Sequence, residues 1–357
     1  MHVVTDPPER HRVLGMMSGS SLDGVDLALV VFERLGERWS HRVEDCRTVA
    51  YSAATRTRLL KLMDGSAHEL ARCDRDLGVS LGSMASEFLA GRKVDLITSH
   101  GHTIFHAPDE GWTCQIGHGA WIAASSGVDV VCDLRTMDMA HGGQGAPLVP
   151  FGERSLYPDH QVFLNLGGIA NLSMHGREPV AFDVCICNQA LNDLAGSLGQ
   201  EYDAGGAVAR QGSLDRGLLE ELNSEAFLHK PPPRSLGREW YTTRMRPLLF
   251  GPGIRTEDAL RTVTEHIATA ISEAVPSGGT DDILCTGGGA FNTFLMERIT
   301  ELVSRPIVVP GPEVVSYKEA IIFAFLGLMR KLGRRNVLAD TTGAHRSSVG
   351  GALYSAN

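Results

Sequence analysis

Two glycines and one carboxylate near the middle of the chain form the pattern with the clearest chemical meaning. Residues 161–183 read QVFLNLGGIANLSMHGREPVAFD, in which Gly167-Gly168 interrupts two apolar runs and Asp183 ends a third. Paired glycines let the backbone approach a bulky anion closely and direct its N–H groups toward that anion. The pattern therefore predicts an anion-binding turn, with a carboxylate at the end of a nearby strand.

A similar pattern lies near the N-terminus. Residues 13–30 read VLGMMSGSSLDGVDLALV, an apolar run followed by a Gly/Ser turn that contains Asp23 and by a second apolar run that contains Asp26. Two such hairpins, roughly half a chain apart, indicate a duplicated architecture that holds a phosphate between two lobes. Two unrelated glycine-rich hairpins would give the same spacing, so the spacing alone leaves both interpretations open.

The elements that must position these turns follow from hydrophobic periodicity. Residues 161–183 predict three strands joined by two turns. Residues 67–90 carry apolar side chains at steps of three and four, which predicts a long helix with one buried face. Residues 282–299 predict a strand, a triple-glycine turn at 287–289 and a helix. This last pattern suits the phosphate or adenosine end of a nucleotide, and equally a close crossing of helix and strand.

Histidines and cysteines raise the question of a metal site. His100, His102 and His106 lie close together in the sequence, but no carboxylate at ligand spacing completes a set. Structural or substrate-contacting histidines are therefore favoured over metal ligands. Cys185 and Cys187 form a C-x-C pair without a second pair or a suitably spaced histidine, which favours packing over zinc binding.

Length and composition set the broad class. A chain of 357 residues exceeds the ~250–300 at which single hydrophobic cores stop growing, so two domains are expected. We expect one lobe from residues 1–137 plus 345–357, and a second from 138–344. The seven cysteines are an odd number, which favours free thiols in a reducing compartment.

Charge and hydropathy limit the partners. A net charge of −9 without a block of Lys or Arg argues against binding to nucleic acid. No apolar run approaches the ~20 residues that span a bilayer, and the first residues lack a basic segment followed by a hydrophobic one. We therefore expect a cytoplasmic protein without a membrane partner.

Six stretches resemble, in the same order, the anhydro-N-acetylmuramic acid kinase family of the actin and hexokinase-like superfamily. Together they run along nearly the whole chain, and their combination is specific although each alone is weak. They are MSGSSLDGVDLALV (17–30), SHGHTIFHAP (99–108), DLRTMDMAHGGQGAPLVP (133–150), FLNLGGIANLS (163–173), TGGGAFN (286–292) and TGAHRSSVGGAL (342–353).

The resemblance implies a fold and an activity. The fold is α/β, a two-lobed actin/hexokinase-like (ribonuclease H-like) ATPase with an interdomain cleft. The activity is a kinase of peptidoglycan recycling that uses ATP and Mg²⁺ to phosphorylate O6 of 1,6-anhydro-N-acetylmuramic acid while water opens the anhydro bridge at C1. Its partners would be the sugar and ATP, and a homodimer is left open.

The resemblance also implies roles for residues. Asp183 matches the catalytic carboxylate, a general base worth roughly 10²–10⁴ in rate, and Asp23 is a candidate to hold Mg²⁺ directly or through water. The expected sugar contacts are Arg135, Glu319, His102 and Asn188. The expected ATP contacts are Gly19, Ser20, Ser21, Leu22, Asp23, Gly24, Val25, Asp26, Gly167, Gly168, Gly287, Gly288 and Gly289.

One segment departs from the family pattern. Members commonly follow the catalytic Asp with Thr-Gly-Pro and then Asn, whereas residues 183–188 here read DVCICN. A stiffer apolar run has replaced a flexible polar turn, which motivates an alternative: a kinase of the same fold that acts on another sugar or amino sugar. A non-catalytic ATP-binding switch is a third hypothesis, against which Arg135, Asp183 and Glu319 stand as charged groups that a nucleotide clamp does not need.

Overall fold

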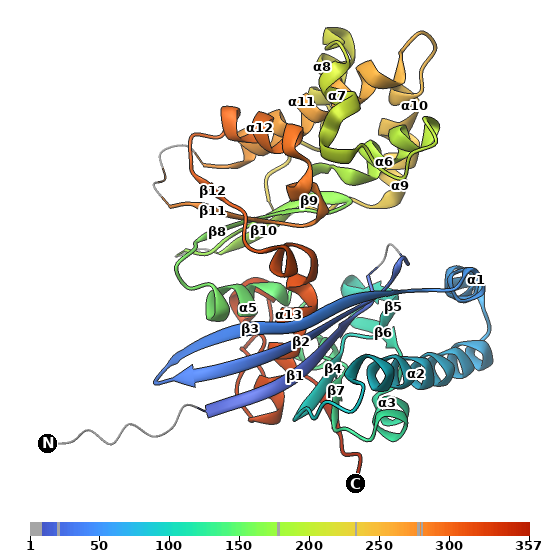
Figure 1. Ribbon diagram of the computed structural model, residues 1–357, viewed down its shortest axis with the longest axis vertical. Helices are drawn as coiled ribbons and strands as arrows, with labels where there is room; N and C mark the ends of the chain where they lie inside the picture. Colours follow the sequence, from blue (N-terminus) through green and yellow to red (C-terminus); the bar gives the residue numbers. More distant parts are fainter. Residues whose placement is uncertain (1–8, 20–21, 177–178, 233, 277–278, 280) are drawn as a thin grey trace, which may run out of the picture. The chain divides into compact units, whose positions relative to one another are not determined.

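Two α/β units make up the chain, one formed by residues up to Pro158 together with Tyr317–Asn357, the other by Asp159–Ser316. The structure is a computed structural model that describes residues 9–19, 22–176, 179–232, 234–276, 279 and 281–357 (Figure 1). The α/β class predicted from the sequence is confirmed. Within the described residues, no helix combines the length and apolar character needed to cross a membrane.

The first unit is built on a six-stranded sheet of order β13-β7-β4-β1-β2-β3. Strands β1, β2 and β3 form an antiparallel meander, β4 and β7 continue the sheet in parallel, and β13 closes it antiparallel to β7. A separate hairpin pairs β5 with β6. The strands are β1 (Glu9–Met17), β2 (Gly24–Leu35), β3 (Arg38–Ala50), β4 (Leu96–Ser99), β5 (His102–Ala107), β6 (Trp112–Ile116), β7 (Val130–Cys132) and β13 (Ala352–Tyr354).

Helices pack against this sheet at close range. Helix α13 approaches β1 so closely that a Cβ on Gly15 would lie 2.0 Å from the carbonyl oxygen of Ala320. Helix α2 begins with a capping box formed by Ser66 and Glu69, and its C-cap Ala90 is left-handed at φ 47. The helices are α1 (Ala53–Lys61), α2 (Ala67–Leu89), α3 (Gly119–Ser126), α4 (Thr136–Ala140), α5 (Val149–Leu156), α13 (Pro312–Lys331) and α14 (Ala339–Thr342).

The second unit is built on a five-stranded sheet of order β10-β9-β8-β11-β12. Strands β8, β9 and β10 form an antiparallel meander, and β11 and β12 continue the sheet in parallel. The strands are β8 (Val162–Leu166), β9 (Ile169–Met174), β10 (Val180–Ile186), β11 (Ile283–Thr286) and β12 (Ile307–Val308). The helices are α6 (Asn188–Ser197), α7 (Ala207–Gln211), α8 (Arg216–Asn223), α9 (Arg238–Trp240), α10 (Arg246–Leu249), α11 (Thr256–Ala274) and α12 (Thr293–Leu302), with a π-helical turn at Tyr241–Met245.

The two sheets share one topology. The order β7-β4-β1-β2-β3 in the first unit corresponds, strand by strand, to β12-β11-β8-β9-β10 in the second. In both sheets the first two strands of the meander flank a Gly-containing turn, and the next two strands, β4 and β7 or β11 and β12, are parallel to the first. This correspondence favours the duplicated architecture over two unrelated hairpins.

The units divide at different residues from those expected. Residues 138–158 and 317–344 belong to the first unit and not to the second. The physical reason is close packing: a Cβ on Gly152 would lie 2.5 Å from the Ile322 side chain, and Lys318 forms a buried ion pair with Glu153 at 2.9 Å. Helix α5 and the second part of α13 therefore pack together within the first unit.

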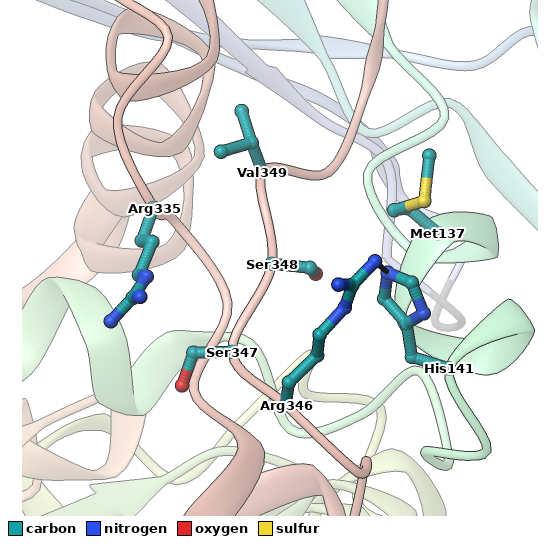
Figure 2. Close-up of a pocket in the computed structure, with 7 residues that line it drawn as sticks. All are labelled: Met137, His141, Arg335, Arg346, Ser347, Ser348 and Val349. Atoms are coloured by element: carbon teal, nitrogen blue, oxygen red, sulfur yellow. Dashed lines mark hydrogen bonds between the residues drawn. The ribbon is translucent and has the colours of Figure 1, made fainter.

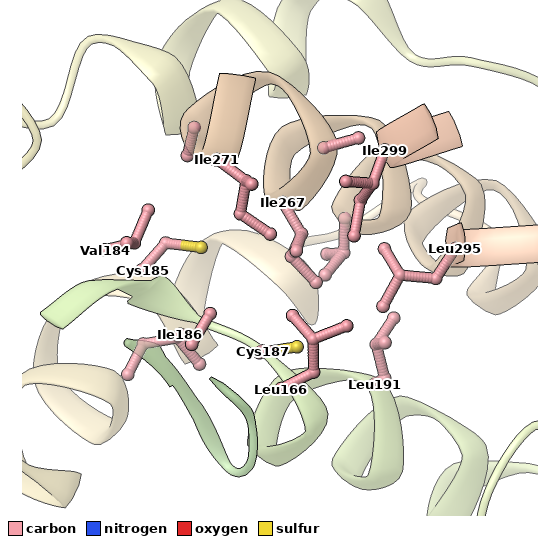
Figure 3. Packing of buried hydrophobic residues seen from close by; sticks show 14 of the residues in the cluster. Leu166, Val184, Cys185, Ile186, Cys187, Leu191, Ile267, Ile271, Leu295 and Ile299 are labelled. Atoms are coloured by element: carbon pink, nitrogen blue, oxygen red, sulfur yellow. The ribbon is translucent and has the colours of Figure 1, made fainter. Parts of the chain in front are cut away.

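Each unit has its own hydrophobic core. The first combines the meander strands with α2, whose Cys73, Leu77 and Leu81 are buried. In the second, α11 contributes Ile267 and Ile271 to a cluster with strands β8 to β11 and with α6 and α12 (Figure 3). Fully burying one such aliphatic side chain stabilises the fold by about 1.5–3 kcal/mol, so the cores hold the strand ends and turns in fixed positions.

Candidate active site

Both glycine turns of the second unit meet at the start of helix α6. The carbonyl oxygen of Gly167 accepts the N–H of Asn188 at 3.1 Å, and that of Gly168 accepts the N–H of Gln189 at 3.1 Å. The Asn188 side chain donates from Nδ2 to the Leu166 carbonyl at 2.7 Å. Asn188 therefore ties the β8–β9 turn to the first turn of α6.

The triple-glycine turn lies against the same residues. Gly287 has φ 86, and a Cβ there would lie 2.7 Å from the backbone of Leu166, so only glycine fits this position. A Cβ on Gly289 would lie 3.1 Å from Asn188 Oδ1. The structure thus brings the 287–289 turn together with Gly167, Gly168 and Asn188, which lie about a hundred residues or more before it in the sequence.

A row of polar side chains crosses the second sheet beside these turns. Asp183 pairs with Asn171, Asn171 pairs with Asn165, and Asn165 pairs with Thr286. Directly paired residues project on the same face of a sheet. Thr286 Oγ1 donates to Asn165 Oδ1 at 3.4 Å, so the row leads from the triple-glycine turn to Asp183.

Asp183 is a half-buried carboxylate with one oxygen fixed by the backbone. Its Oδ2 accepts the N–H of Leu236 at 2.8 Å, while its own backbone N–H and carbonyl pair with Arg234. Burial raises the pKa of Asp183, and the Leu236 N–H and the Arg234 guanidinium partly offset that rise. A raised pKa makes the ionised side chain a better proton acceptor near neutral pH.

The departure from the family turn lies inside the core. Val184, Cys185, Ile186 and Cys187 are each at most 2 % exposed. Figure 3 shows the two thiols among the aliphatic side chains of α6, α11 and α12. Burial raises the pKa of both Cys185 and Cys187 far above the ordinary range of a thiol, so these thiols are inert packing groups.

The first unit's turn follows β1. Gly19 accepts the N–H of Leu22 at 3.3 Å, and Leu22 is left-handed at φ 59. The expected ATP contacts Ser20 and Ser21 lie outside the described residues. Leu22 and Val25 are 7 % and 0 % exposed and belong to the core of the first unit, which leaves their backbones as the parts able to contact a ligand.

Two carboxylates flank this turn. Asp23 is exposed, and Asp26 lies on β2, where its Oδ1 accepts the Thr48 hydroxyl at 2.6 Å. Burial, and to a lesser degree the charge of Asp23, raise the pKa of Asp26. Gly24 starts the strand where a Cβ would lie 2.3 Å from the Val49 carbonyl.

A chain of hydrogen bonds holds the start of the turn. The Tyr51 hydroxyl donates to Ser18 Oγ at 2.8 Å, and Ser18 Oγ lies 3.0 Å from His102 Nδ1. Because Ser18 Oγ accepts from Tyr51, its own proton is free to go to Nδ1. Burial lowers the pKa of His102, which keeps the ring neutral for that role. His102 therefore orients the turn through Ser18.

Arg135 is held by two partners in the first unit. Its Nε donates to His100 Nε2 at 3.0 Å, and its Nη1 donates to the Gly145 carbonyl at 2.7 Å. His100 Nδ1 lies 3.0 Å from the Gly101 carbonyl, so the ring carries its proton on Nδ1 and accepts on Nε2. Burial lowers the pKa of His100 to about 3 and that of Arg135 to about 10.

Glu319 interacts electrostatically with Arg135. Surrounding protein atoms raise the pKa of Glu319, although the residue keeps access to solvent, and Lys318 and Arg135 oppose the rise. Lys318 is itself fixed by its buried ion pair with Glu153. The first unit thus presents a cation, Arg135, that buried neighbours hold in place, and an exposed carboxylate, Glu319, that interacts with it electrostatically.

Sequence reasoning missed several residues of this arrangement. Arg234 and Leu236 follow a run of prolines and carry no motif. Asn165 and Asn171 are paired because three residues separate Leu166 from its partner Ala170. The two-residue turn expected at Gly167-Gly168 would have paired Asn165 with Ala170. The sequence favoured a structural or substrate-contacting role for His100, but it gave no sign that its ring holds Arg135.

Taken unit by unit, the arrangement offers the parts of a phosphoryl-transfer site. Glycine turns give backbone N–H groups close access to anionic oxygens, Asp183 is a proton acceptor, and Arg135 and Glu319 can bind a polar substrate. Within the described residues, no group of three or more His, Cys, Asp or Glu side chains forms a metal cage. A cation held by Asp23 together with substrate phosphates and water suits Mg²⁺, which seldom uses an all-protein cage.

The family model and the curated relatives agree on one family. Residues 11–356 match the family model described as anhydro-N-acetylmuramic acid kinase. The chain is 35 % identical over 374 residues to the protein of that name from Vibrio vulnificus (strain CMCP6), covering 96 % of this chain and 98 % of the relative. It is 35 % identical over 375 residues to the one from Gloeobacter violaceus, with the same coverage. Among solved structures, component A of the (R)-2-hydroxyglutaryl-CoA dehydratase of Acidaminococcus fermentans matches with a TM-score of 0.46 and 14 % identity, over 90 % of this chain and 99 % of that one.

Proposed function

Because the chain belongs to the anhydro-N-acetylmuramic acid kinase family, we propose that it is an ATP-dependent kinase of 1,6-anhydro-N-acetylmuramic acid. The reaction opens the 1,6-anhydro ring and phosphorylates O6, which gives N-acetylmuramic acid 6-phosphate and ADP in cell-wall recycling. The observation that carries the proposal is Asp183, a half-buried carboxylate with a raised pKa and one oxygen held by a backbone N–H.

Asp183 acts as the general base. Water attacks C1 of the sugar, the C1–O6 bond breaks, and O6 takes the γ-phosphoryl group of ATP, so that ADP leaves. The proton of the attacking water passes to the Asp183 carboxylate. Leu236 fixes Oδ2 at 2.8 Å, whereas no hydrogen bond reaches Oδ1 from the described residues, so Oδ1 is the atom assigned to accept the proton.

The glycine turns bind the nucleotide. The proposal assigns the phosphates to the backbone of residues 19–26 and of Gly167-Gly168, and the adenosine side to the 287–289 turn. Asp23 would hold Mg²⁺ directly or through water, and the ion would supply charge neutralisation to the transferring phosphoryl group. The carbonyls of Gly167 and Gly168 are occupied by α6, which leaves their N–H groups for phosphate oxygens.

Arg135, Glu319 and Asn188 are assigned to the sugar. Arg135 suits the carboxylate of the substrate's lactyl group, because a guanidinium binds a carboxylate through two parallel hydrogen bonds. Glu319 suits hydroxyl or amide donors of the sugar. The buried His102, whose Nδ1 is engaged with Ser18, is assigned to positioning and not to direct contact with the sugar.

The other sugar kinase considered from the sequence gains no support from the structure. It was motivated by residues 184–187, and these side chains are enclosed in the core of the second unit. Asp183 and Asn188, which both remain partly accessible, are the family residues at either end of that run. The proposal also includes a cytoplasmic location, with the sugar and ATP as its partners.

The test is to incubate the purified protein with Mg-ATP and the anhydro sugar in ¹⁸O-labelled water. We expect stoichiometric ADP and N-acetylmuramic acid 6-phosphate, with the label on the C1 hydroxyl and none in the phosphate. Reactions without sugar, or with reducing N-acetylmuramic acid in its place, are the controls. Phosphorylation confined to reducing sugars, or label in the phosphate, would contradict the proposal.

A further inference from the structure

A pocket in the first unit, separate from the residues assigned above, carries positive charge only. Its volume is about 510 Å³, and its lining residues are Met137, His141, Arg335, Arg346, Ser347, Ser348 and Val349 (Figure 2). The lining contains no Asp or Glu, although the whole chain carries a net charge of −9. The pocket therefore has a local charge opposite in sign to that of the whole chain.

The two arginines of the pocket differ from most arginines of the chain in their partners. Among the described residues, neither Arg335 nor Arg346 forms an ion pair with a carboxylate. Arg346 instead donates from Nη2 toward His141 Nε2 at 3.4 Å, a contact that orients the guanidinium without neutralising its charge. A guanidinium presents five N–H donors, and most of those on Arg346 remain available to a ligand.

Ser348 supplies an independent sign of a ligand. The residue is 6 % exposed, and its Oγ has no hydrogen-bond partner in the described part of the chain. Its backbone is fixed by pairing with Val337. Figure 2 shows the hydroxyl directed toward the Arg346 guanidinium and the His141 ring. A buried hydroxyl without a partner is costly, and an anionic oxygen that reaches it after a local shift of the exposed Arg346 side chain would accept its proton.

We propose that this pocket, centred on Arg346, Ser348 and His141, binds the phosphate group of a small phosphomonoester. A phosphate dianion offers three terminal oxygens. These match the Arg346 guanidinium, the Ser348 hydroxyl and the His141 ring better than the two oxygens of a carboxylate do. Pockets for small organic ligands measure roughly 300–1,000 Å³, so the volume leaves room for an organic part beside the phosphate. The remaining lining residues, Met137, Arg335, Ser347 and Val349, complete the wall of the pocket.

Binding to the purified full-length protein tests the proposal. Glucose 6-phosphate, inorganic phosphate and unphosphorylated glucose are titrated by isothermal calorimetry at constant ionic strength. The variants are Arg346→Gln and Ser348→Ala, with Arg72→Gln as the matched control, because Arg72 is an exposed arginine of the same unit without an acidic partner among the described residues. Thermal unfolding of each variant verifies the fold; Ser348→Ala removes only an unpaired hydroxyl and should unfold at the wild-type temperature or above.

The expected result is that glucose 6-phosphate binds the wild type and the Arg72 variant equally, while glucose does not bind. Arg346→Gln should weaken binding about ten- to a hundredfold, the loss of one charge-assisted contact, and Ser348→Ala should weaken it severalfold. Absence of wild-type binding at millimolar concentration, or equal binding by Arg346→Gln, would overturn the site. Equal affinity for inorganic phosphate would overturn its assignment to an organic phosphate. None of these outcomes depends on kinase activity.

Discussion

Replacing Asp183 by Asn is the sharpest test of the proposed chemistry. The amide oxygen can still accept the Leu236 N–H that the carboxylate accepts at 2.8 Å, and the backbone contacts with Arg234 do not involve the side chain. The substitution therefore removes the proton acceptor and leaves the local structure intact. General base catalysis is worth roughly 10²–10⁴ in rate, or about 2.7–5.5 kcal/mol of activation free energy.

The assay is steady-state ADP release in the presence of the anhydro sugar, with ATP varied. We expect kcat to fall by roughly 10²–10⁴ and the KM for ATP to stay unchanged. The pKa of Asp183 is raised in the folded protein. At neutral pH, where the carboxylate is ionised, its burial therefore lowers the stability of the folded state. A neutral Asn should therefore leave the Tm unchanged or raise it.

The matched control is Asp215→Asn. Asp215 caps α8 in the same unit by accepting the Leu218 N–H at 3.0 Å, and Asn is an equally good cap. It removes one negative charge without touching the proposed site, and its kcat should equal that of the wild type. If Asp183→Asn turned over within about threefold of the wild type, well short of the lower bound for a lost base, the base assignment would be wrong.

Four further outcomes follow from the same contacts. The kcat/KM of the wild type should fall as pH decreases through a value above 3.8, because burial raises the pKa of the Asp183 carboxyl that must be ionised, and a pH profile will show whether this acid limb exists. Arg135→Lys should raise the KM for the sugar about tenfold or more while leaving that for ATP unchanged, because an ammonium lacks the paired donors of a guanidinium. Lys318→Met breaks a buried ion pair and should destabilise the first unit by about 3–5 kcal/mol, seen as a lower Tm, whereas adding Glu153→Leu should restore most of the loss. Tyr51→Phe removes the hydroxyl that donates to Ser18 and should raise the KM for ATP with little change in the KM for the sugar, measured by varying each substrate in turn.

The positions of the two hairpin turns could be predicted from the residue types in the sequence. Glycine pairs, an acidic residue at a strand end and alternating apolar runs are local features, and the structure places a β-hairpin at both predicted positions. Asp183 and Asn188 both lie near the glycine turn, because β10 ends at Ile186 and α6 begins at Asn188. Local patterns therefore located the hairpins, while the roles of their residues stay predictions.

Contacts between distant segments could not be predicted. Arg234 lies 51 residues from Asp183, and no periodicity links an irregular stretch to a particular strand. The unit boundary was missed for a related reason: the periodicity of α13 shows that one face is buried, but not which sheet buries it. The close approach of Gly15 on β1 to Ala320 on α13 shows that the first sheet buries this helix. No local pattern in the sequence connects these two residues.

Side-chain direction was the other gap. Val25 belongs to a stretch that resembles a phosphate loop, yet its side chain is 0 % exposed. Alternation along β2 would have predicted that Val25 and Leu27 point inward while Asp26 points outward. The resemblance identified the loop as a unit, and the strand geometry separates its core residues from those that a ligand can reach.

The burial of Val184 to Cys187 in the core of the second unit also limits which substitutions this segment can accept. Grafting the Thr-Gly-Pro turn of its relatives onto this scaffold would empty space that is filled by branched and sulfur-bearing side chains packed on Leu191 and Ile267. Each large-to-small exchange of this kind forfeits about 1–5 kcal/mol. A stable graft would require compensating enlargement of neighbouring side chains in the same core, so the segment is part of the packing of the second unit and not an exchangeable loop.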